Sequence, residues 1–469
     1  MLPELMRFLD EQYGLPGMGL AYYISFRTLM AGLTAGIVGW LLGPSLIRLL
    51  VRHSLRETIR SDGPSSHASK KGTPTMGGLL ILLSLAVGIL LWGDLSSPYV
   101  WALLGLAVWL SSLGFLDDWL KRRWGKKGLP PRFKLLGQLA AALWLVLLMM
   151  GDPRFYSTRP KVRPNGTLLP SATLREVGFQ RGDRLRSVEE TPFDYKTWRF
   201  RPTFPDGHFP AFYGVERQGR LERLAIPPEK RSTVAGELFG QQHPDALFRT
   251  NVPFLKNQEI SYGRFGSWDL PYWLKGLVYA AVILFILVAT SNAFNLTDGL
   301  DGLAVGVGAI AFVSLGSFAY FSSNRIWADY FMIMYLPYAA EVTVFAGAAC
   351  GACIAFLWYN AYPAQVFMGD TGSLMLGGLI GAMALMVKKE LLLPLIAGIS
   401  FAETVSVMLQ VAYFRYTRRK YGQGRRIFRM APLHHHFELG GWHEVKVVVR
   451  FWIVALLLNG LAFITLKLR

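Results

Sequence analysis

Two adjacent carboxylates, Asp117 and Asp118, follow an apolar run that is long enough to form a membrane helix. A strongly basic loop, residues 122–134, comes shortly after them. Carboxylates at the end of a membrane helix are costly to desolvate unless a cation or a metal ion faces them. A solvated acid pair that only closes the helix is the alternative. We favour a site, because similar polar boxes follow other apolar runs.

A second box, residues 292–302, places two asparagines and two aspartates among glycines at an expected helix start. Asp298 and Asp301 are three residues apart, so they can share one helical face, and Asn292 and Asn295 precede them. Glycines let a ligand approach the backbone closely. A plain helix N-cap explains one such polar residue but not four. This box therefore indicates a ligand pocket.

A third box, residues 360–373, begins with Asn360 and brings Asp370 to the mouth of another apolar run. Helix-end amides and a Mg²⁺ ion can hold phosphate oxygens at such a place. The turn Gly-Asp-x-Gly-Ser is common, however, so it is a weak signal by itself. Phe367 either stacks on a base or is an interfacial aromatic.

Three consecutive histidines, residues 434–436, follow a basic segment. Adjacent side chains diverge and no cysteine supports them, so zinc is disfavoured, and phosphate binding by imidazole and guanidinium groups fits better. The two cysteines, Cys350 and Cys353, lie in an apolar Gly/Ala-rich run. There we expect small packing residues rather than redox chemistry or half a zinc site.

The composition identifies the elements that must position these boxes. The chain has 469 residues, of which 52% are hydrophobic and 17% charged, and soluble domains usually carry about a quarter charged residues. This favours an α-helical polytopic membrane protein. The net charge of +18 resides in loops beside apolar runs. That distribution suits anionic headgroups and phosphorylated substrates better than nucleic acid, so we expect no nucleic-acid partner.

About ten runs are long enough to span a bilayer. We expect no cleavable signal peptide, because residues 1–19 are polar and the first apolar run is too long for the apolar region of one. The predicted spans are residues 21–50, 76–92, 99–116, 135–150, 273–291, 303–321, 342–358, 374–387, 391–414 and 447–466.

Basic residues concentrate in the loops after the first, third and ninth predicted spans. By the positive-inside rule these loops lie in the cytosol, and both termini lie outside. All the polar boxes then fall on the cytosolic face. We therefore expect one composite site there, in a protein of the bacterial cytoplasmic (inner) membrane.

The segment 151–270 differs from the rest, because it is polar and has prolines throughout. It divides the chain into 1–150 with four predicted spans, the insert 151–270, and 271–469 with six. An insert of this length predicts a small β-rich module, which the orientation places outside the cytoplasm. Residues 177–188 and 212–220 resemble a turn, a strand and a later hairpin of PDZ domains. A β-rich insert of another fold would show a similar sequence pattern.

Taken together, the boxes closely resemble the phospho-N-acetylmuramoyl-pentapeptide transferase family. The matching runs are GTPTMGG (72–78), FLDD (115–118), NLTDGLDGLA (295–304), VFMGDTGS (366–373) and MAPLHHHFE (430–438). The resemblance covers nearly all of the chain except the insert, and the histidine box separates it from relatives that use UDP-N-acetylglucosamine. Two departures stand out, namely the insert and a lengthened loop at residues 416–424.

The resemblance implies transfer of phospho-N-acetylmuramoyl-pentapeptide from its UDP-linked form to undecaprenyl phosphate, with release of UMP. It implies Mg²⁺ as cofactor, bound by Asp370. An envelope protein at the insert and a homodimer are left open as further partners. The resemblance assigns catalysis to Asp117, Asp118, Asp370, His434 and His435. It assigns substrate binding to Lys70, Thr75, Lys121, Lys134, Asn292, Asn295, Asp298, Asp301, Asn360, Phe367 and Gln410.

Two questions of chemistry stay open in the sequence. A phosphate monoester needs little general-base help, because its second pKa lies near neutrality, and this favours direct attack by the lipid phosphate. A covalent phospho-aspartate through Asp117 or Asp118 is chemically allowed.

A transporter is a distant alternative function, since Glu403 is an acid within a predicted span. A UDP-N-acetylglucosamine transferase is the nearer one.

Overall fold

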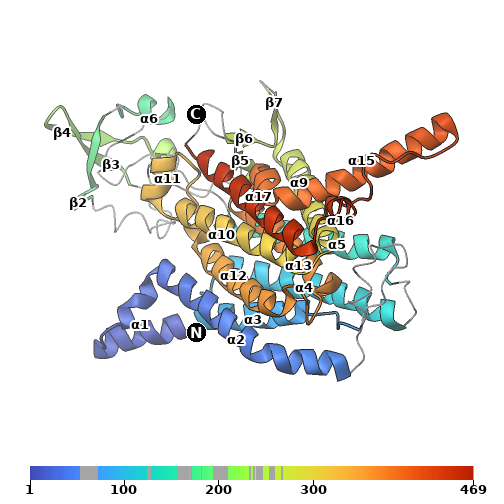
Figure 1. Cartoon of the computed structure of the whole chain (residues 1–469). Helices are drawn as coiled ribbons and strands as arrows, with labels where there is room; N and C mark the ends of the chain where they lie inside the picture. The colour runs from blue at the N-terminus through green and yellow to red at the C-terminus, as the bar shows by residue number, and fades with distance from the viewer. Residues whose placement is uncertain are drawn as a thin grey trace.

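The computed structural model describes residues 1–52, 72–123, 128–155, 168, 172–180, 182–193, 210–231, 234–235, 238, 247–252, 259–265 and 268–467. Each of the ten predicted spans coincides with a helix or, in the ninth case, with a broken helix (Figure 1). The helices are α2 (Ile24–Arg52), α3 (Gly78–Trp92), α4 (Pro98–Arg123), α5 (Pro131–Gly151), α9 (Tyr272–Thr297), α10 (Leu303–Ser323), α12 (Ala340–Asn360), α13 (Gly369–Met386), α15 (Gly398–Tyr421) and α17 (Glu444–Ile464).

Length and composition make this a polytopic membrane protein. Within the described residues, eight helices are long and apolar enough to cross a bilayer, and a bent pair makes up to nine. The second predicted span, α3, is apolar but has only 15 residues. It is therefore shorter than the roughly 20 residues that a bilayer core requires.

The ninth predicted span is not straight. A short turn η8 (Glu390–Leu392) leads into α14 (Leu393–Ile396), and α15 then leaves at an angle of 85°. The break falls at Ala397, whose backbone is not helical, directly before Gly398. Residues 416–421 were expected to form a loop but continue α15, which ends where Gly422 adopts a φ of 74°. This bend carries the far end of α15 away from the bundle (Figure 1).

Helices α2 and α12 pack closely because glycines line their contact. A Cβ atom on Gly351 would lie 2.0 Å from the carbonyl oxygen of Gly32, and one on Gly43 would meet the ring of Tyr359 at 2.2 Å. Small residues bring helix backbones together in membranes, where apolar surface alone does not drive association. The partly buried Cys350 and the fully buried Cys353 lie on the same helix as free thiols.

The residues before the first predicted span form a helix that the sequence analysis did not identify. Helix α1 (Leu2–Tyr13) precedes a short turn, η1 (Met18–Tyr22). Its apolar residues recur at helical spacing between acids, so the average hydropathy conceals an amphipathic helix. Leu5 and Phe8 are exposed on its surface.

The insert contains a small antiparallel sheet of four strands in the order β2-β1-β3-β4. The strands are β1 (Arg184–Val188), β2 (Thr191–Pro192), β3 (Phe212–Arg217) and β4 (Arg220–Ala225), preceded by α6 (Ala172–Glu176). They enclose a separate core that includes Phe179, Leu185, Tyr213 and Val215. The expected β-rich module is present, and its PDZ-like character stays a prediction.

The end of the insert belongs to the helical bundle. Leu247, Phe248 and Tyr262 pack in the main core, beside strands β5 (Arg249–Asn251) and β6 (Glu259–Ser261). Buried Lys388 donates to the carbonyl oxygen of Leu247 at 2.6 Å and to the hydroxyl of Tyr279 at 2.9 Å. A hairpin of β7 (Arg264–Phe265) and β8 (Trp268–Asp269) then leads into α9.

The remaining short helices connect the bundle at its two ends. Helix α11 (Arg325–Phe331) follows α10, and α16 (Leu433–Glu438) precedes α17. Figure 1 places strands β1 to β4 and the C-terminus at one end of the bundle, and the end of α4 with the start of α5 at the opposite end.

Candidate functional site

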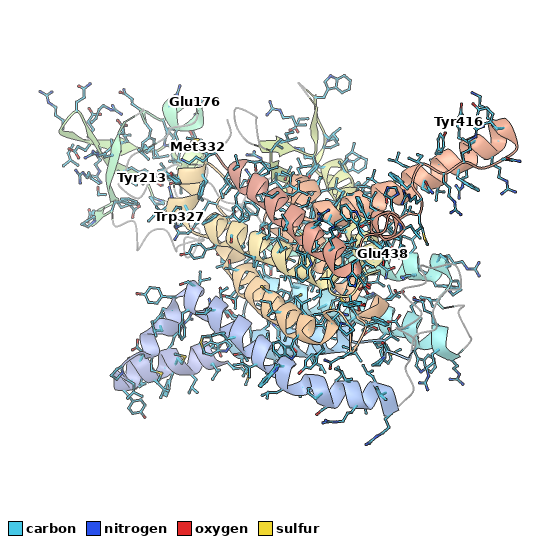
Figure 2. The ribbon with its side chains drawn as sticks, viewed as in Figure 1. Glu176, Tyr213, Trp327, Met332, Tyr416 and Glu438 are labelled. Atoms are coloured by element: carbon cyan, nitrogen blue, oxygen red, sulfur yellow. The ribbon has the colours of Figure 1, made fainter. Side chains whose placement is uncertain are left out.

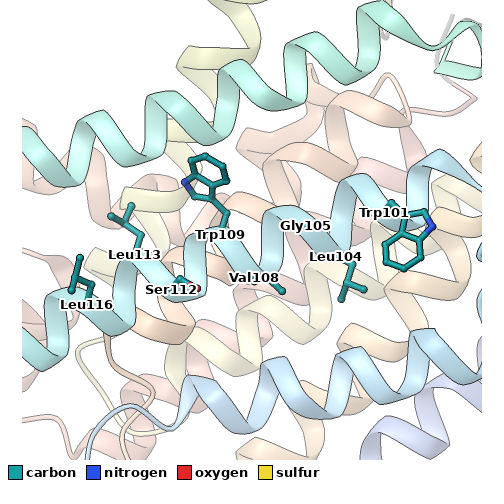
Figure 3. Close-up of a pocket in the computed structure, with 8 residues that line it drawn as sticks. All are labelled: Trp101, Leu104, Gly105, Val108, Trp109, Ser112, Leu113 and Leu116. Carbon is teal, nitrogen blue, oxygen red and sulfur yellow. The ribbon is translucent and has the colours of Figure 1, made fainter.

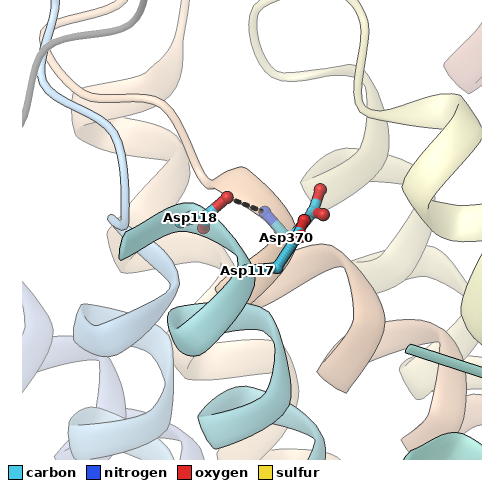
Figure 4. A group of neighbouring side chains, drawn as sticks. All are labelled: Asp117, Asp118 and Asp370. Carbon is cyan, nitrogen blue, oxygen red and sulfur yellow. Dashed lines mark hydrogen bonds between the residues drawn. The ribbon is translucent and has the colours of Figure 1, made fainter. Parts of the chain in front are cut away.

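Three carboxylates meet where α4 ends and α13 begins. Asp117 and Asp118 lie in the last turns of α4, and Asp370 lies in the first turn of α13 (Figure 4). Each offers an oxygen within 4.8 Å of the others. Asp117 is only 2% exposed and Asp118 only 6% exposed. The first and third predicted boxes are therefore one cluster.

Glycines permit this approach. A Cβ atom on Gly114, one turn before Asp117, would lie 2.1 Å from the carbonyl oxygen of Asp370. Gly369 has a φ of 70°, and a Cβ atom on it would lie 2.6 Å from Oδ2 of Asp118. Any larger residue at either position would push the two helices apart. Sequence reasoning did not single out Gly114, because nothing local shows what faces it.

Asp118 caps the N-terminus of α13 from another helix. Its Oδ1 accepts from the amide of Asp370 at 3.3 Å, and its Oδ2 accepts from the amide of Thr371 at 3.1 Å and from its hydroxyl at 2.8 Å. A carboxylate satisfies the free amides at a helix start and is stabilised by the helix dipole. Both oxygens of Asp118 are thus engaged in holding α13.

Asp117 and Asp370 face two lysines. Nζ of Lys121 lies 2.7 Å from Oδ2 of Asp117 and 2.9 Å from Oδ2 of Asp370. Nζ of Lys134, from the first turns of α5, lies 2.5 Å from the same oxygen of Asp370. The amide of Leu129 donates to Oδ1 of Asp117 at 2.6 Å, which ties the residues just before α5 to the cluster. Two ammonium groups therefore face Asp117 and Asp370.

The second box joins the cluster through Asn295. Its Nδ2 donates to Oδ1 of Asp370 at 2.6 Å and to the hydroxyl of Ser373 at 2.9 Å. Asn292 lies about one turn earlier on α9 and donates to Gln138 of α5 at 3.0 Å. Asn295 is therefore in direct contact with the carboxylates, and Asn292 joins two neighbouring helices.

The predicted shared helical face of Asp298 and Asp301 is wrong, because the two aspartates lie in the turn between α9 and α10. Asp298 directly follows α9, and its backbone N–H donates to Phe294. Oδ2 of Asp301 accepts from the amide of Ala364 at 3.0 Å. Asn360 accepts from the amide of Gly302 at 3.0 Å and donates to the carbonyl oxygen of Val366 at 2.8 Å. Asp301 and Asn360 thus fix the loop that leads to Asp370.

Glu444 also contributes to this arrangement, although sequence reasoning did not identify it. Its Oε1 accepts from the amide of Asp301 at 2.8 Å, and the residue is buried in the first turn of α17. An acid at a helix start ordinarily indicates a favourable dipole interaction and nothing more. Only the folded chain shows that it anchors the second box.

The histidine box forms the short helix α16 beside the second box. His434 is 1% exposed, and its backbone amide donates to Oε1 of the buried Glu403 at 3.2 Å. A Cβ atom on Gly299 would lie 2.3 Å from Nε2 of His434, so the imidazole contacts the turn after α9. Nδ1 of His435 lies 2.9 Å from Glu438. The structure therefore brings the histidine box next to the second box, residues 292–302.

Gln410 holds the segment that precedes the histidines. Its Oε1 accepts from the amides of Ile427 and Phe428 at 3.0 Å, and its Nε2 donates to the carbonyl oxygen of Phe428 at 3.1 Å. Gln410 thus joins α15 to the approach to α16, and its role in substrate binding stays a prediction.

The box at residues 72–78 lies against Phe367. The amide of Phe367 donates to the carbonyl oxygen of Pro74 at 2.8 Å, and the amide of Gly77 donates back to Phe367 at 2.8 Å. A Cβ atom on Gly369 would lie 2.8 Å from the hydroxyl of Thr75, which places Thr75 beside the carboxylate cluster. Lys70 lies outside the described residues.

An open apolar groove runs along α4 up to the cluster. Its volume is about 640 Å³, and its lining extends from Trp101 to Leu116, the residue before Asp117 (Figure 3). Trp109 in this stretch donates to the carbonyl oxygen of Gly137 at 3.1 Å and so joins α4 to α5. The lining suits the acyl chains of a surrounding bilayer, whereas the carboxylates at its end do not.

The donor set suits a hard divalent cation. Asp117 and Asp370 present carboxylate oxygens that are already matched by ammonium groups, so a positive charge is favoured between them. Mg²⁺ prefers oxygen ligands of this kind and binds through one or two carboxylates together with substrate phosphates. The side chain of Lys121 is 43% exposed, so it can turn outward when another cation or a ligand enters.

Comparisons with known proteins show which family the chain resembles. A phospho-N-acetylmuramoyl-pentapeptide-transferase signature matches residues 70–82, and the profile of Glycosyl transferase family 4 matches residues 250–388. Proteins with that transferase name are 39% identical in Chloroherpeton thalassium, 38% in Chlorobaculum parvum and 36% in Flavobacterium psychrophilum.

Each of these alignments covers 100% of both chains, so these relatives also carry the segment that the sequence analysis gave as a departure from the family, the insert. The insert is therefore a feature that this chain shares with these relatives. Identity of this extent over the full length shows descent, and the chain belongs to the phospho-N-acetylmuramoyl-pentapeptide-transferase family.

Proposed function

We propose that this protein transfers phospho-N-acetylmuramoyl-pentapeptide from its UDP-linked form to undecaprenyl phosphate. The products are UMP and the first lipid-linked precursor of peptidoglycan. The observation that carries the proposal is the cluster of Asp117, Asp370, Lys121 and Lys134 at the end of membrane helices, in a chain whose full-length relatives bear this name. Such a place lets a lipid phosphate meet a water-soluble nucleotide.

The lysines are the groups that receive the phosphates. Lys121 and Lys134 both contact Oδ2 of Asp370 and can exchange this carboxylate for phosphate oxygens without leaving the cluster. Asp118 acts as a positioning residue, because its oxygens hold the start of α13. Asn295 orients Asp370 from α9. Mg²⁺, held by Asp370 with Asp117 beside it, would offset the repulsion between the two anionic substrates and stabilise the leaving UMP.

The reaction is a single displacement. An oxygen of the lipid phosphate attacks the sugar-linked phosphorus of the UDP-sugar, and the bond from that phosphorus to the bridging oxygen breaks. UMP leaves with the bridging oxygen, and the lipid acquires a diphosphate linked to the sugar. The lipid phosphate needs no strong base near neutral pH. Asp117 already accepts from Leu129 and pairs with Lys121, and this supports direct attack over a phospho-aspartate intermediate.

The nucleotide pocket is proposed on the same face. Thr75, Phe367 and Asn295 line the approach to the carboxylates, and His434 and His435 close it from α16. By the positive-inside argument this face is cytosolic, and the insert and both termini lie on the other side of the membrane. A homodimer and an envelope partner at the insert remain proposals.

A substrate comparison tests the function. Purified protein in detergent with Mg²⁺ and undecaprenyl phosphate is given either UDP-N-acetylmuramoyl-pentapeptide or UDP-N-acetylglucosamine, and UMP release is measured. We expect turnover of the first nucleotide only. Turnover of the second alone would assign the protein to the sister activity, and turnover of neither by a folded sample would refute the proposal.

A further inference from the structure

The far half of α15 extends outside the helical bundle. Every residue from Val411 to Tyr421 is exposed except Thr417, and Tyr416 is 55% exposed. Figure 2 shows Tyr416 near the tip of this projection, far from the other labelled residues. We call residues 405–426 the α15 arm. A helix exposed on all sides requires an environment that stabilises it.

The inner part of the arm is apolar. No charged residue occurs between Glu403 and Arg415. Met408 is 65% exposed, Leu409 is 50% exposed and Val411 is 41% exposed. A contiguous apolar surface of this kind is unfavourable in water but favourable in the acyl region of a bilayer.

The outer part of the arm is basic. No acid occurs between Glu403 and Glu438, and the arm contains six cations. They are Arg415, Arg418, Arg419, Lys420, Arg425 and Arg426. Within the described residues none of these forms an ion pair with a carboxylate.

Aromatic rings lie among these cations. Lys420 lies 5.6 Å from the ring centre of Tyr416 and 5.3 Å from that of Tyr421, and Arg425 lies 4.9 Å from that of Tyr421. Tyrosine is enriched at the membrane–water interface, where one end of the side chain is apolar and the other is hydrated. The order along the arm, apolar then aromatic then basic, matches the order of layers that a helix meets on leaving a bilayer core.

We propose that the α15 arm is an anchor for anionic lipid headgroups. The inner turns lie among acyl chains, and the arginines and lysine at the tip bind the phosphates of acidic phospholipids. Guanidinium groups bind phosphate oxygens in pairs. The positive charge of the tip favours lipids with a net negative charge over zwitterionic ones, whose ammonium group it repels. A second copy of the arm is an unsuitable partner, because two tips with six cations each repel one another.

The anchor also has a structural consequence for the histidine box. Gln410 at the base of the arm binds Ile427 and Phe428, which lead to α16. Headgroups bound at the tip would therefore hold the segment between α15 and α16 as well. Each basic residue near a membrane surface raises the binding constant for anionic lipid by roughly fivefold.

Local lipid enrichment around the tip tests the proposal. A bimane dye is attached to a Gln423→Cys variant in nanodiscs of 70% phosphatidylcholine and 30% phosphatidylglycerol, as nominal mixtures. The composition is kept constant, and brominated chains, which quench the dye, are placed on either the anionic or the zwitterionic lipid. Labelled protein without the substitution corrects for any reaction at Cys350.

We expect quenching per brominated lipid to be several-fold stronger from phosphatidylglycerol. Arg418→Gln with Arg419→Gln should bring the ratio close to one. Arg48→Gln with Arg52→Gln removes the same charge from the exposed end of α2 and should leave the ratio unchanged. Equal quenching by both lipids in the unmodified arm, equal effects of the two charge variants, or no quenching by either lipid would each overturn the proposal.

Discussion

Two pairs of lysines occupy opposite ends of the molecule and differ in their partners. At the carboxylate cluster, Lys121 and Lys134 face Asp117 and Asp370, and the side chain of Lys121 is 43% exposed. At the end near the insert, Lys388 is fully buried and Lys389 is 1% exposed.

The second pair binds neutral oxygens. Lys388 donates to a carbonyl and a phenol, and Lys389 donates to Oδ1 of Asn251 at 2.6 Å. A partly exposed lysine beside carboxylates can exchange one anion for another. Removal of such a buried ammonium would leave those buried oxygens without their donor, so it fastens the chain instead. We therefore expect the first pair to serve chemistry and the second to serve the fold.

The largest effect is expected from Asp370→Asn. A neutral amide binds Mg²⁺ poorly and cannot pair with the two lysines, so UMP release should fall by about a thousandfold, the scale of losing one main electrostatic contact. The unfolding temperature in detergent should change little. Asp329→Asn, at an exposed acid on α11, is the matched control and should retain activity. Near-normal turnover of Asp370→Asn would remove this residue from the site.

Lys121→Met and Lys388→Met should have reciprocal effects. The first removes a charged contact to substrate, worth about 1.5–3 kcal/mol, and should lower turnover by about ten- to a hundredfold with little change in stability. The second leaves a buried carbonyl and hydroxyl without their donor, and should destabilise the fold by about 1–3 kcal/mol with turnover of folded protein changed only a few-fold. Turnover and thermal unfolding are measured on both. The comparison fails if both variants lose the same property.

Two deletions of different length should distinguish the β-rich module from the residues at the end of the insert that contact Lys388 and Lys389. The position of the insert between two predicted spans suggests that a Gly/Ser linker in place of Arg154–Asn251 would leave UMP release within tenfold. The structure shows that this deletion removes Leu247 and Asn251, which hold Lys388 and Lys389. A shorter deletion, residues 156–246, keeps them and should leave release within tenfold, because coupling across the membrane is typically modest.

The longer deletion is the control, and it should give less folded protein. Yields and UMP release are compared for the two variants after detergent purification. Loss of activity in the shorter variant, if it is folded, would make the insert part of the working enzyme.

The smallest effect concerns pH. Burial lowers the pKa of Lys388 from 10.5 to about 8, while the carboxylate of Glu390 acts in the opposite direction. Tyr279, Tyr262 and Lys389 are the other titratable groups near it. Between pH 8 and 10.5 the unfolded chain keeps this proton and the folded chain loses it, so stability rises with pH in this window. The unfolding temperature of the wild type minus that of Lys388→Met should increase from pH 8 to 10.5. A flat or falling difference would contradict the shift.

The apolar runs could be read from the sequence because they depend on local properties, namely length and hydropathy over about 20 residues. The boxes were also visible, since polar residues beside membrane runs are rare and need a reason. The bend before α15 was not predicted, because Pro394 and Gly398 are tolerated within straight membrane helices as well. The amphipathic α1 was missed, because averaging hides a one-sided pattern.

The sequence by itself determined that this is a polytopic membrane protein and where most of its helices lie. It also showed that the polar boxes match the motifs of one family. Only the tertiary structure decided which polar residues meet the carboxylates and which hold loops. Asn295 and Asn360 look alike in the chain, but one contacts Asp370 and the other binds Gly302 and Val366. The difference arises because each amide pairs with whichever group packing leaves unsatisfied beside it, and that packing depends on residues such as Gly114, far from it in sequence.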